Sequence, residues 1–438
     1  MGASYSSPDL TITVVDKCLP KYAYRPFPSH RKKEPGGLIA EFTAFPPDIC
    51  RAADADANYW WTDCQFLAYN DSALYVMATP YHIRLQHTWL PVRGFPQGKI
   101  CRYDIAGERF CCKPLPTFCS VYPKVQPHPD GQQFAFIGDG EVVVKCDDEE
   151  LRNNYRVPRD LNFSLCKYCA ISPSGHYLSV LSRVHGSYEI QVYSMDCKLS
   201  VIGTTMCHRI CPEFVATPKY NEHVECMWSP DSKYLAVGSS LAVLFIMDCC
   251  QFTNICNVFA DVIDDCTLST VHAFDFNPLY GHHILSVGGT DSNIYTIDVI
   301  EGKIIQKTES HSKSMIDCIK YSPDGTTVAV AMGDFSIKLF DMHDCSPMFS
   351  IVVKDVCSTT RQPTAGAYPA SIHLCFTKSG EELAVSSSDG YIRIWQLPRK
   401  LNLQYLCKMN ILTLMPVNSL KKINLPKQLI HFLLDDYK

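Results

Sequence analysis

The stretch that decides the fold is CIKYSPDGTTVAVAMGDFSIKLFDM, residues 318–342. Two apolar alternating runs flank a Ser-Pro-Asp-Gly turn, and a bend of small residues separates the second run from a third. Proline presets the first corner of a β-turn, and Asp and Gly favour the positions that follow. Runs of Val, Ile, Tyr and Phe beside such turns are typical of strands. The stretch therefore predicts consecutive antiparallel strands.

The same pattern returns with a period near 45 residues. The turn prolines lie at positions 129, 173, 230, 278 and 323, at intervals of 44, 57, 48 and 45 residues. The pattern occurs in seven copies, at residues 64–85, 128–146, 169–182, 226–248, 274–299, 318–342 and 374–397. A four-stranded unit repeated about every 40–45 residues is typical of a β-propeller blade. We therefore predict an all-β fold, a seven-bladed β-propeller.

A propeller needs a closing strand, because an open ring exposes the edge of a sheet. Residues 38–44 (LIAEFTA) precede the first copy and are expected to complete the last blade. The propeller is then expected to span residues 37–398. Residues 1–36, rich in Pro, Lys and Arg towards their end, are expected to form an N-terminal arm.

Composition excludes several classes of protein. Apolar residues make up 46% of the chain and charged residues 19%, which is a globular balance rather than a disordered one. The net charge of −5 offers no basic footprint for nucleic acid. The longest apolar run, residues 241–247, is far shorter than the roughly 20 residues of a transmembrane helix. We expect neither nucleic-acid binding nor a transmembrane segment.

The chain contains 23 cysteines. Its first residues show no basic and then apolar leader pattern. We therefore expect reduced, mostly buried thiols rather than a disulfide framework, and a location in the cytoplasm or the nucleus.

The last two copies resemble the WD-repeat family. Asp389 and Gly390 lie at the tight turn of that family, and Trp395 lies where its strand-ending Trp stands. In the preceding copy, His311 precedes the first strand and Asp334 occupies the turn. The resemblance implies that these two residues form a structural hydrogen bond rather than a catalytic pair.

Asp291 is a third aspartate at such a turn. The chain departs from the family in having no Trp-Asp dipeptide, and Phe340-Asp341 is its nearest substitute. The resemblance covers residues 37–398 and is strongest in the C-terminal half.

No enzyme motif accompanies the repeats. The sequence contains no G-x-G-x-x-G, G-x-x-x-x-G-K-[ST], H-E-x-x-H or G-x-S-x-G pattern. Cys166 and Cys169 have a zinc-like spacing, but an odd offset on a strand should place them on opposite faces. The residues Cys207, His208 and Cys211 lie in a long stretch between copies. We predict no catalytic activity, no metal and no cofactor.

The pattern changes after Pro398. Leu403, Cys407 and Ile411 follow one another at i, i+4 and i+8, which predicts one stripe of a helix. Pro416 ends this segment, and a second helical segment is expected after Pro426. Short apolar helices need a cover, which is either the propeller wall or a groove in another protein.

Residues 401–438 resemble a SOCS box. The resemblance implies an elongin-binding motif formed by Leu403, Cys407 and Ile411. It also implies a cullin-docking segment, whose expected residues are Ile423, Leu425, Pro426, Leu429 and Phe432, with Leu433 behind them. Asn424 replaces the first of the two prolines usual in that segment.

These resemblances imply a substrate-recognition subunit of an elongin BC–cullin ubiquitin ligase. The expected partners are elongin B, elongin C, cullin-5 with its RING partner, and a protein substrate held by the propeller. One alternative is a WD-repeat scaffold without a ligase role, whose tail packs on the propeller. A third hypothesis is a propeller that joins a ubiquitin ligase through a different adaptor. It is disfavoured because the Trp-Asp-x-Arg adaptor motif of the WD-repeat family is absent.

The first residues, Met-Gly-Ala-Ser-Tyr-Ser, fit a myristoylation pattern with Gly2 as the acceptor. A single acyl chain would give only marginal, reversible membrane association.

Overall fold

The structure is a computed structural model. It describes residues 11–13, 22–23, 38–43, 59–67, 70–81, 98–105, 108–110, 115–117, 124–131, 133–138, 141–146, 155–156, 165–184, 187–195, 199–212, 214, 224–239, 243–258, 271–278, 283–310, 312–334, 336–342, 345–352, 372–387, 391–397, 399–400 and 426.

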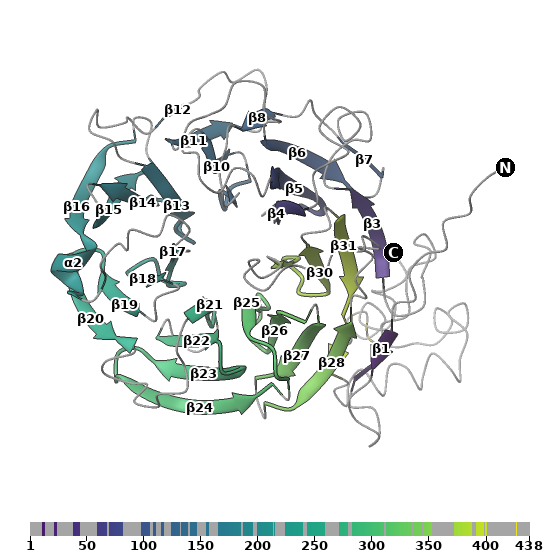
Figure 1. Ribbon diagram of the computed structural model, residues 1–438. Coiled ribbons are helices and arrows are strands. Elements are labelled where there is room, and N and C mark those ends of the chain that lie inside the picture. The colour runs from purple at the N-terminus through teal and green to yellow at the C-terminus, as the bar shows by residue number, and fades with distance from the viewer. Residues whose placement is uncertain are drawn as a thin grey trace.

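Seven antiparallel sheets surround a central axis, one for each predicted copy (Figure 1). Blade 1 contains β4 (Tyr59–Leu67), β5 (Asn70–Tyr81), β6 (Gly98–Asp104) and β7 (Arg109–Phe110), with β8 (Leu115–Thr117) also paired to β6. Blade 2 contains β9 (Val125–Pro127), β10 (Gln133–Gly138), β11 (Glu141–Cys146) and β12 (Tyr155–Arg156). Blade 3 contains β13 (Leu165–Ile171), β14 (Tyr177–Val184), β15 (Ser187–Ser194) and β16 (Val201–Met206).

Blade 4 contains β17 (Val224–Trp228), β18 (Tyr234–Ser239), β19 (Val243–Asp248) and β20 (Thr253–Asn257). Blade 5 contains β21 (Val271–Phe276), β22 (Ile284–Gly289), β23 (Asn293–Asp298) and β24 (Lys303–Glu309). Blade 6 contains β25 (Ile316–Tyr321), β26 (Thr327–Met332), β27 (Ser336–Asp341) and β28 (Pro347–Val352). Blade 7 contains β29 (His373–Phe376), β30 (Glu382–Ser386) and β31 (Tyr391–Gln396), followed by β3 (Leu38–Thr43).

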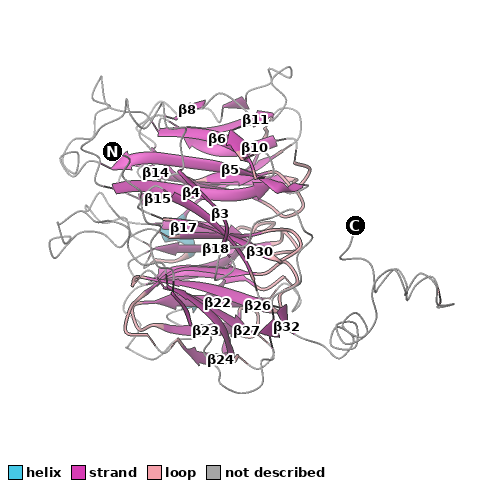
Figure 2. Ribbon diagram, turned by 90° about the vertical axis from the view of Figure 1, so that its right-hand side faces the viewer, coloured by secondary structure: helices cyan, strands magenta, loops and turns pink. Residues whose placement is uncertain are grey.

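The predicted all-β, seven-bladed propeller is confirmed. Within the described part of the chain, the α-helix is limited to α2 (Cys207–Ile210), and no helix there is long and apolar enough to cross a membrane. Figure 2 shows the propeller from the side, with its strands running between the two faces of the ring.

The turn between the first two strands of a blade has the predicted geometry. In blade 6 the Ser322 amide donates to Thr327 O at 2.8 Å, and the Gly325 amide donates to Ser322 O at 2.8 Å. Gly325 has φ 65°, a left-handed conformation that glycine adopts without steric cost. Equivalent bonds close the turns at Ser172, Ser229 and Thr377. The Ser-Pro-Asp-Gly pattern therefore specifies a hairpin locally.

The second strand of each blade is buried on both faces, because neighbouring blades stack on it. In β26, all residues from Val328 to Met332 are fully buried. They form a continuous apolar run, so the side chains on both faces of the strand are apolar. Leu339 and Ile351 of blade 6 join Leu374 and Trp395 of blade 7 in one apolar cluster. The hydrophobic core is thus distributed between the blades.

The predicted closing strand is confirmed. β3 pairs with β31, with Leu38 opposite Trp395 and Thr43 opposite Tyr391. Leu38 belongs to the apolar cluster between blades 6 and 7. The guanidinium of Arg393, only 1% exposed, donates to Glu41 Oε2 at 2.9 Å. An ion pair therefore joins the two ends of the ring.

Two short strands lie in the region expected to be an arm. β1 (Thr11–Thr13) pairs with β28 and extends blade 6 to five strands. β2 (Tyr22–Ala23) pairs with β32 (Arg399–Lys400), which follows the last blade. The sequence did not indicate either pairing.

We predict that Glu41→Ala weakens ring closure. The substitution leaves Arg393 buried without its carboxylate, and should lower the free energy of unfolding by about 1–3 kcal/mol, since Glu41 is partly exposed. Chemical denaturation measures the change, with Glu309→Ala on the exposed outer strand β24 as the control. Equal stability of the two variants would show that the pair does not help to close the ring.

Candidate functional site

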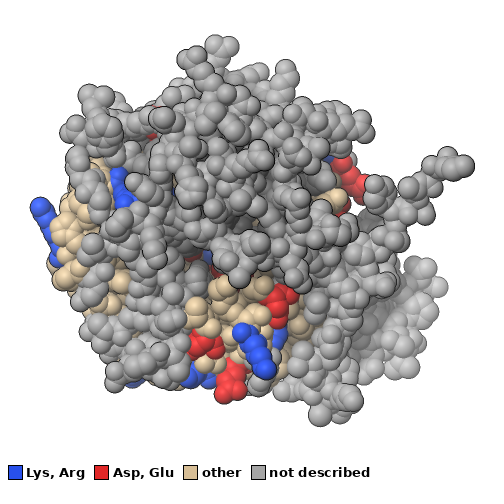
Figure 3. Space-filling view, in the orientation of Figure 1, with Lys and Arg blue, Asp and Glu red and all other residues tan. Residues whose placement is uncertain are grey.

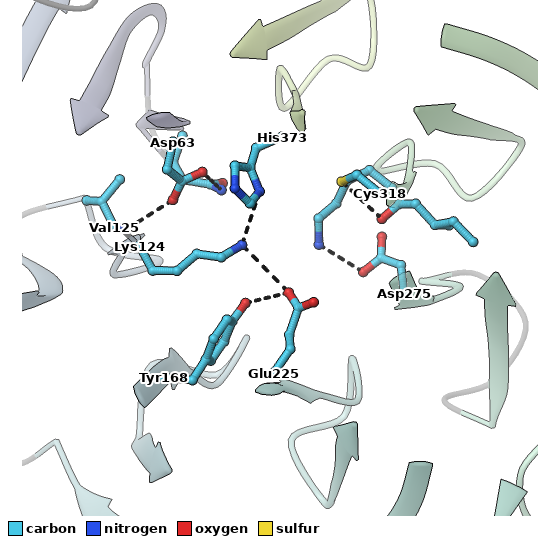
Figure 4. Close-up of polar contacts among 11 residues, drawn as sticks. Asp63, Lys124, Val125, Tyr168, Glu225, Asp275, Cys318 and His373 are labelled. Carbon is cyan, nitrogen blue, oxygen red and sulfur yellow. Dashed lines mark hydrogen bonds and ion pairs between the residues drawn. The ribbon is translucent and has the colours of Figure 1, made fainter. Parts of the chain in front are cut away.

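A ring of polar side chains surrounds the central axis. Each blade contributes at least one residue from its innermost strand or from the residue just before it (Figure 4). In chain order the ring residues are Asp63, Lys124, Tyr168, Glu225, Asp275, Cys318 with Lys320, and His373.

One half of the ring is centred on Lys124. Its ammonium group lies 3.6 Å from Glu225 Oε1 and 3.4 Å from His373 Nδ1, to which it can donate. The same group lies 5.3 Å from the centre of the Tyr168 ring, and the Tyr168 hydroxyl donates to Glu225 Oε1 at 2.6 Å. Blades 2, 3, 4 and 7 therefore meet at one cation.

The other half joins blades 5 and 6. Lys320 Nζ donates to Asp275 Oδ1 at 3.3 Å, while the Tyr321 amide donates to Asp275 Oδ2 at 2.7 Å. Asp63 performs the same role between blades 1 and 2, because its Oδ2 accepts from the Val125 amide at 3.0 Å. In both places an aspartate on an inner strand binds a backbone amide of the next blade.

The surroundings keep both lysines charged. Burial by itself would lower the pKa of Lys124, but the negative charges of Glu225 and Asp63 outweigh it and raise that pKa. Burial likewise opposes the charge on Lys320, and Asp275 more than compensates, so the pKa of Lys320 is also raised. Burial raises the pKa of Asp63, and Lys124 and the Val125 amide counteract part of this effect.

The cysteines near the axis are poor nucleophiles. Burial raises the pKa of Cys318 to about 11 and that of Cys375 to about 12. At neutral pH both therefore remain thiols, and the thiol is not the reactive form of cysteine. Among the described residues, no group of three or more His, Cys, Asp or Glu could hold a metal ion.

We predict that Lys124→Met destabilises the propeller from its centre. The substitution removes the cation that faces Glu225 and Asp63, and should lower the free energy of unfolding by about 2–4 kcal/mol. Lys303→Met is the matched control, because Lys303 forms its ion pair with Glu301 at the exposed rim, where such pairs contribute little. A loss of stability equal to that of the control would contradict a structural role for the ring.

Asp291 and Asp334 both lie in the turn between the second and third strands of a blade. Asp334 Oδ1 accepts from the amide of Ser336 at 3.0 Å and from its hydroxyl at 2.5 Å. Asp334 Oδ2 accepts from the Ser312 hydroxyl at 3.2 Å. Asp291 Oδ1 accepts from the Asn293 amide at 3.2 Å, and Asp291 Oδ2 accepts from the Tyr295 hydroxyl at 2.5 Å.

His311, the expected partner of Asp334, lies outside the described residues, as do Asp389 and Gly390. Trp395 is fully buried in blade 7. The hydrogen bonds of Asp291 and Asp334 given above involve none of the central-ring residues.

Asp317 is a half-buried residue that the sequence did not indicate. It is the extra residue of a β-bulge in β25, between the paired residues Ile316 and Cys318. Its Oδ2 is buried and has no hydrogen-bond partner. Burial, together with the negative charge of Asp334, raises the pKa of Asp317 to about 7. Burial would also raise the pKa of Asp334, but its hydrogen bonds from Ser336 outweigh that effect and lower it.

This shift predicts a pH dependence of stability. Between about pH 4 and pH 7 the folded protein binds a proton on Asp317 that the unfolded chain has released, so stability falls as the pH rises through this interval. Asp317→Asn should therefore be more stable than the wild type at pH 8, by about 1–3 kcal/mol, with the gain vanishing near pH 4. Thermal unfolding at both pH values, with Glu309→Gln as the control, tests the sign. A gain that does not vary with pH would contradict it.

The expectation for Cys166 and Cys169 was wrong. A β-bulge between Cys166 and Tyr168 shifts the register of β13, so both sulfur-bearing side chains pack against one apolar cluster between blades 2 and 3. The Ser182 hydroxyl donates to Cys166 Sγ at 3.4 Å, and Cys169 is completely buried. Cys207 and Cys211 are buried on and next to α2, in the core cluster of blades 3 and 4.

The predicted tail sites lie almost entirely outside the described residues. These are Leu403, Cys407, Ile411, Ile423, Leu425, Leu429 and Phe432, together with Gly2 near the other end. Pro426 is described, and it is exposed.

A positional signal for the central ring was present in the sequence. Lys124, Tyr168, Glu225, Cys318 and His373 each lie four residues before the first residue of a predicted turn. The turns begin at His128, Ser172, Ser229, Ser322 and Thr377. Polar residues four positions before each turn, in otherwise apolar strands, would have indicated a ring of polar side chains at the centre of the propeller.

The charges on one face of the propeller are mixed. Figure 3 shows acidic and basic side chains close together in the described part of that face. No broad field of one sign is visible among the described residues there.

Comparison with known proteins agrees with this architecture. The family model of the WD domain, G-beta repeat (WD40), matches residues 302–341 and 366–396. Over 68 residues, 15% of this chain, the sequence is 37% identical to the human WD repeat and SOCS box-containing protein 1, and the match spans 16% of that protein. The crystal structure of the β-propeller domain of Cps50 (Swd1) from Myceliophteria thermophila is similar with a TM-score of 0.55, at 11% identity, over 83% of this chain and 100% of that domain. The chain therefore carries WD40 repeats and folds as a seven-bladed β-propeller.

Proposed function

We propose that this chain is the substrate-recognition subunit of an elongin BC–cullin-5 ubiquitin ligase. In this proposal the propeller holds the target protein, and residues 401–438 form a SOCS box that docks the ligase core. The observation that carries the proposal is the spacing of Leu403, Cys407 and Ile411 directly after a complete propeller. The partial similarity to a human protein named for WD repeats and a SOCS box supports it.

The propeller half suits a recognition role. A WD40 propeller is generally a non-enzymatic interaction scaffold, and this one is closed by β3 and held at its centre by ion pairs. A rigid scaffold presents loops in fixed positions, which is where such folds place their binding residues.

The mechanism would be positional. Target lysines and the ubiquitin donor, when held on one assembly, meet at a high effective concentration instead of by random encounter. This chain would supply no bond-making group. Leu403 would fill a pocket of elongin C, with Cys407 and Ile411 beside it, and Ile423, Leu425 and Pro426 would orient the cullin with Leu429 and Phe432.

The alternative is a scaffold whose tail covers itself on the propeller. The two readings differ in what happens to the apolar side of the tail. A ligase receptor presents Leu403 to elongin C, whereas a scaffold needs no partner for it.

Capture of purified elongin BC by the full-length chain tests the proposal. Leu403→Ala should weaken capture by about tenfold or more, because a buried Leu→Ala change removes about 2–5 kcal/mol. Asn402→Ala is the matched control, since Asn402 lies beside the stripe and not on it, and capture should not change. Failure of the wild-type chain to bind elongin BC would favour the scaffold.

The same capture assay distinguishes cullin-5 binding from elongin BC binding. Pro426→Ala combined with Leu425→Ala should keep elongin BC and lose cullin-5. If cullin-5 binding is absent in the wild type while elongin BC still binds, the cullin-5 part of the proposal is wrong and the elongin part stands.

A further inference from the structure

The N-terminal region is joined to the propeller at three places. β1 pairs with the outer strand of blade 6, β2 pairs with β32 after blade 7, and β3 closes blade 7. Figure 1 shows β1 outside β28 and β3 outside β31, on the same side of the ring. Segments far apart in the sequence thus meet where the chain leaves the propeller.

The outer strand of blade 6 differs from the outer strands of blades 3, 4 and 5. In β16, β20 and β24 the isoleucines Ile202, Ile255 and Ile305 are 48%, 39% and 51% exposed. Each of these isoleucines is the unpaired residue at the bulge of its strand, and the residue at the same position of β28, Met348, is only 6% exposed. Ser350 and Ile351 of β28, 7% and 0% exposed, lie opposite Thr13 and Ile12 of β1. β1 therefore pairs with the edge of a strand whose side chains are buried in the structure.

Ring closure brings β2 close to its partner. β3 is fixed in blade 7 by its pairing with β31 and by the ion pair of Glu41 with Arg393. Residues 24–37 connect β2 to this fixed strand, and residues 14–21 connect β2 to β1. Once β3 is in place, pairing of β2 closes only a short loop, and pairing of β1 then closes another. The conformational entropy lost in each step is therefore small.

We propose that the N-terminal segment containing β1 and β2 is an intramolecular strap. It holds β32 in place, where the chain leaves the propeller. Tyr22 lies opposite Lys400 and Ala23 lies opposite Arg399. β32 follows β31 after two residues, so the strap fixes the backbone at the point where residues 401–438 begin. Leu403 follows Lys400 by three residues. The strap thereby holds the last described strand before the proposed elongin-binding segment, a consequence that rests on the proposed function, whereas the pairing itself does not.

The rate of trypsin cleavage measures how often this pairing opens, because β32 is Arg399–Lys400 and trypsin cleaves after both residues. A protease cuts a paired strand only when the strand opens locally. Ala23→Pro removes the backbone N–H of Ala23 and should disrupt β2. Cleavage after Arg399 and Lys400, followed by mass spectrometry of the fragments that begin at Lys400 or Leu401, should be about tenfold faster in this variant.

Two controls keep the result specific. Ala3→Pro changes the chain before β1 and should cleave at the wild-type rate. Cleavage after Lys320, in the central ring, reports opening of the whole propeller and should not accelerate in Ala23→Pro. Deletion of residues 1–24, which retains β3, should accelerate cleavage at Arg399 and Lys400 as Ala23→Pro does.

Equal rates after Arg399 and Lys400 in the wild type, Ala23→Pro and the deletion would overturn the proposal. The assay uses the chain alone and no ligase component. Its failure is therefore distinct from failure of elongin BC capture, which tests the proposed function.

Discussion

Closure of the ring is the constraint on which the rest of this structure depends. The blades stack face to face, so the middle strands of each are buried only if both neighbouring blades are present. β3 supplies the outer strand of blade 7 from a point more than 350 residues away in the chain, and Glu41 meets Arg393 across that join. Without it, an unpaired sheet edge and the apolar cluster around Leu38 and Trp395 would face water.

The polar residues at the centre of the ring bind backbone amides that ring closure leaves without a partner in their own blade. Innermost strands converge on a narrow axis, and their backbone amides cannot all pair within their own blade. Asp63 and Asp275 accept amides of the next blade, and Lys124 and Lys320 neutralise these carboxylates. Because these charges are satisfied by one another, the central ring is a device for holding blades together. In the proposed function, recognition belongs to the loops of the scaffold.

Some expectations failed for identifiable physical reasons. The opposite-face argument for Cys166 and Cys169 assumed an unbroken period of two, and the bulge in β13 adds a residue and shifts the phase. The same device in β25 places the half-buried Asp317 near the negative charge of Asp334, which no alternation rule could indicate. β1 and β2 are too short to show any periodicity, so their pairing with β28 and β32 was not predictable.

The sequence by itself determined the number of blades, the hairpin turns and the closing strand, because each depends on local turn chemistry and on alternation within a few residues. It also contained the tail motif on which the proposed function rests. Only the tertiary structure decided that Lys124, Glu225 and His373 share one site, since they come from blades 2, 4 and 7. The same holds for the strap that joins Tyr22 to Lys400. Contacts between distant segments depend on the summed twist and stacking of all the blades, and no local pattern encodes that sum.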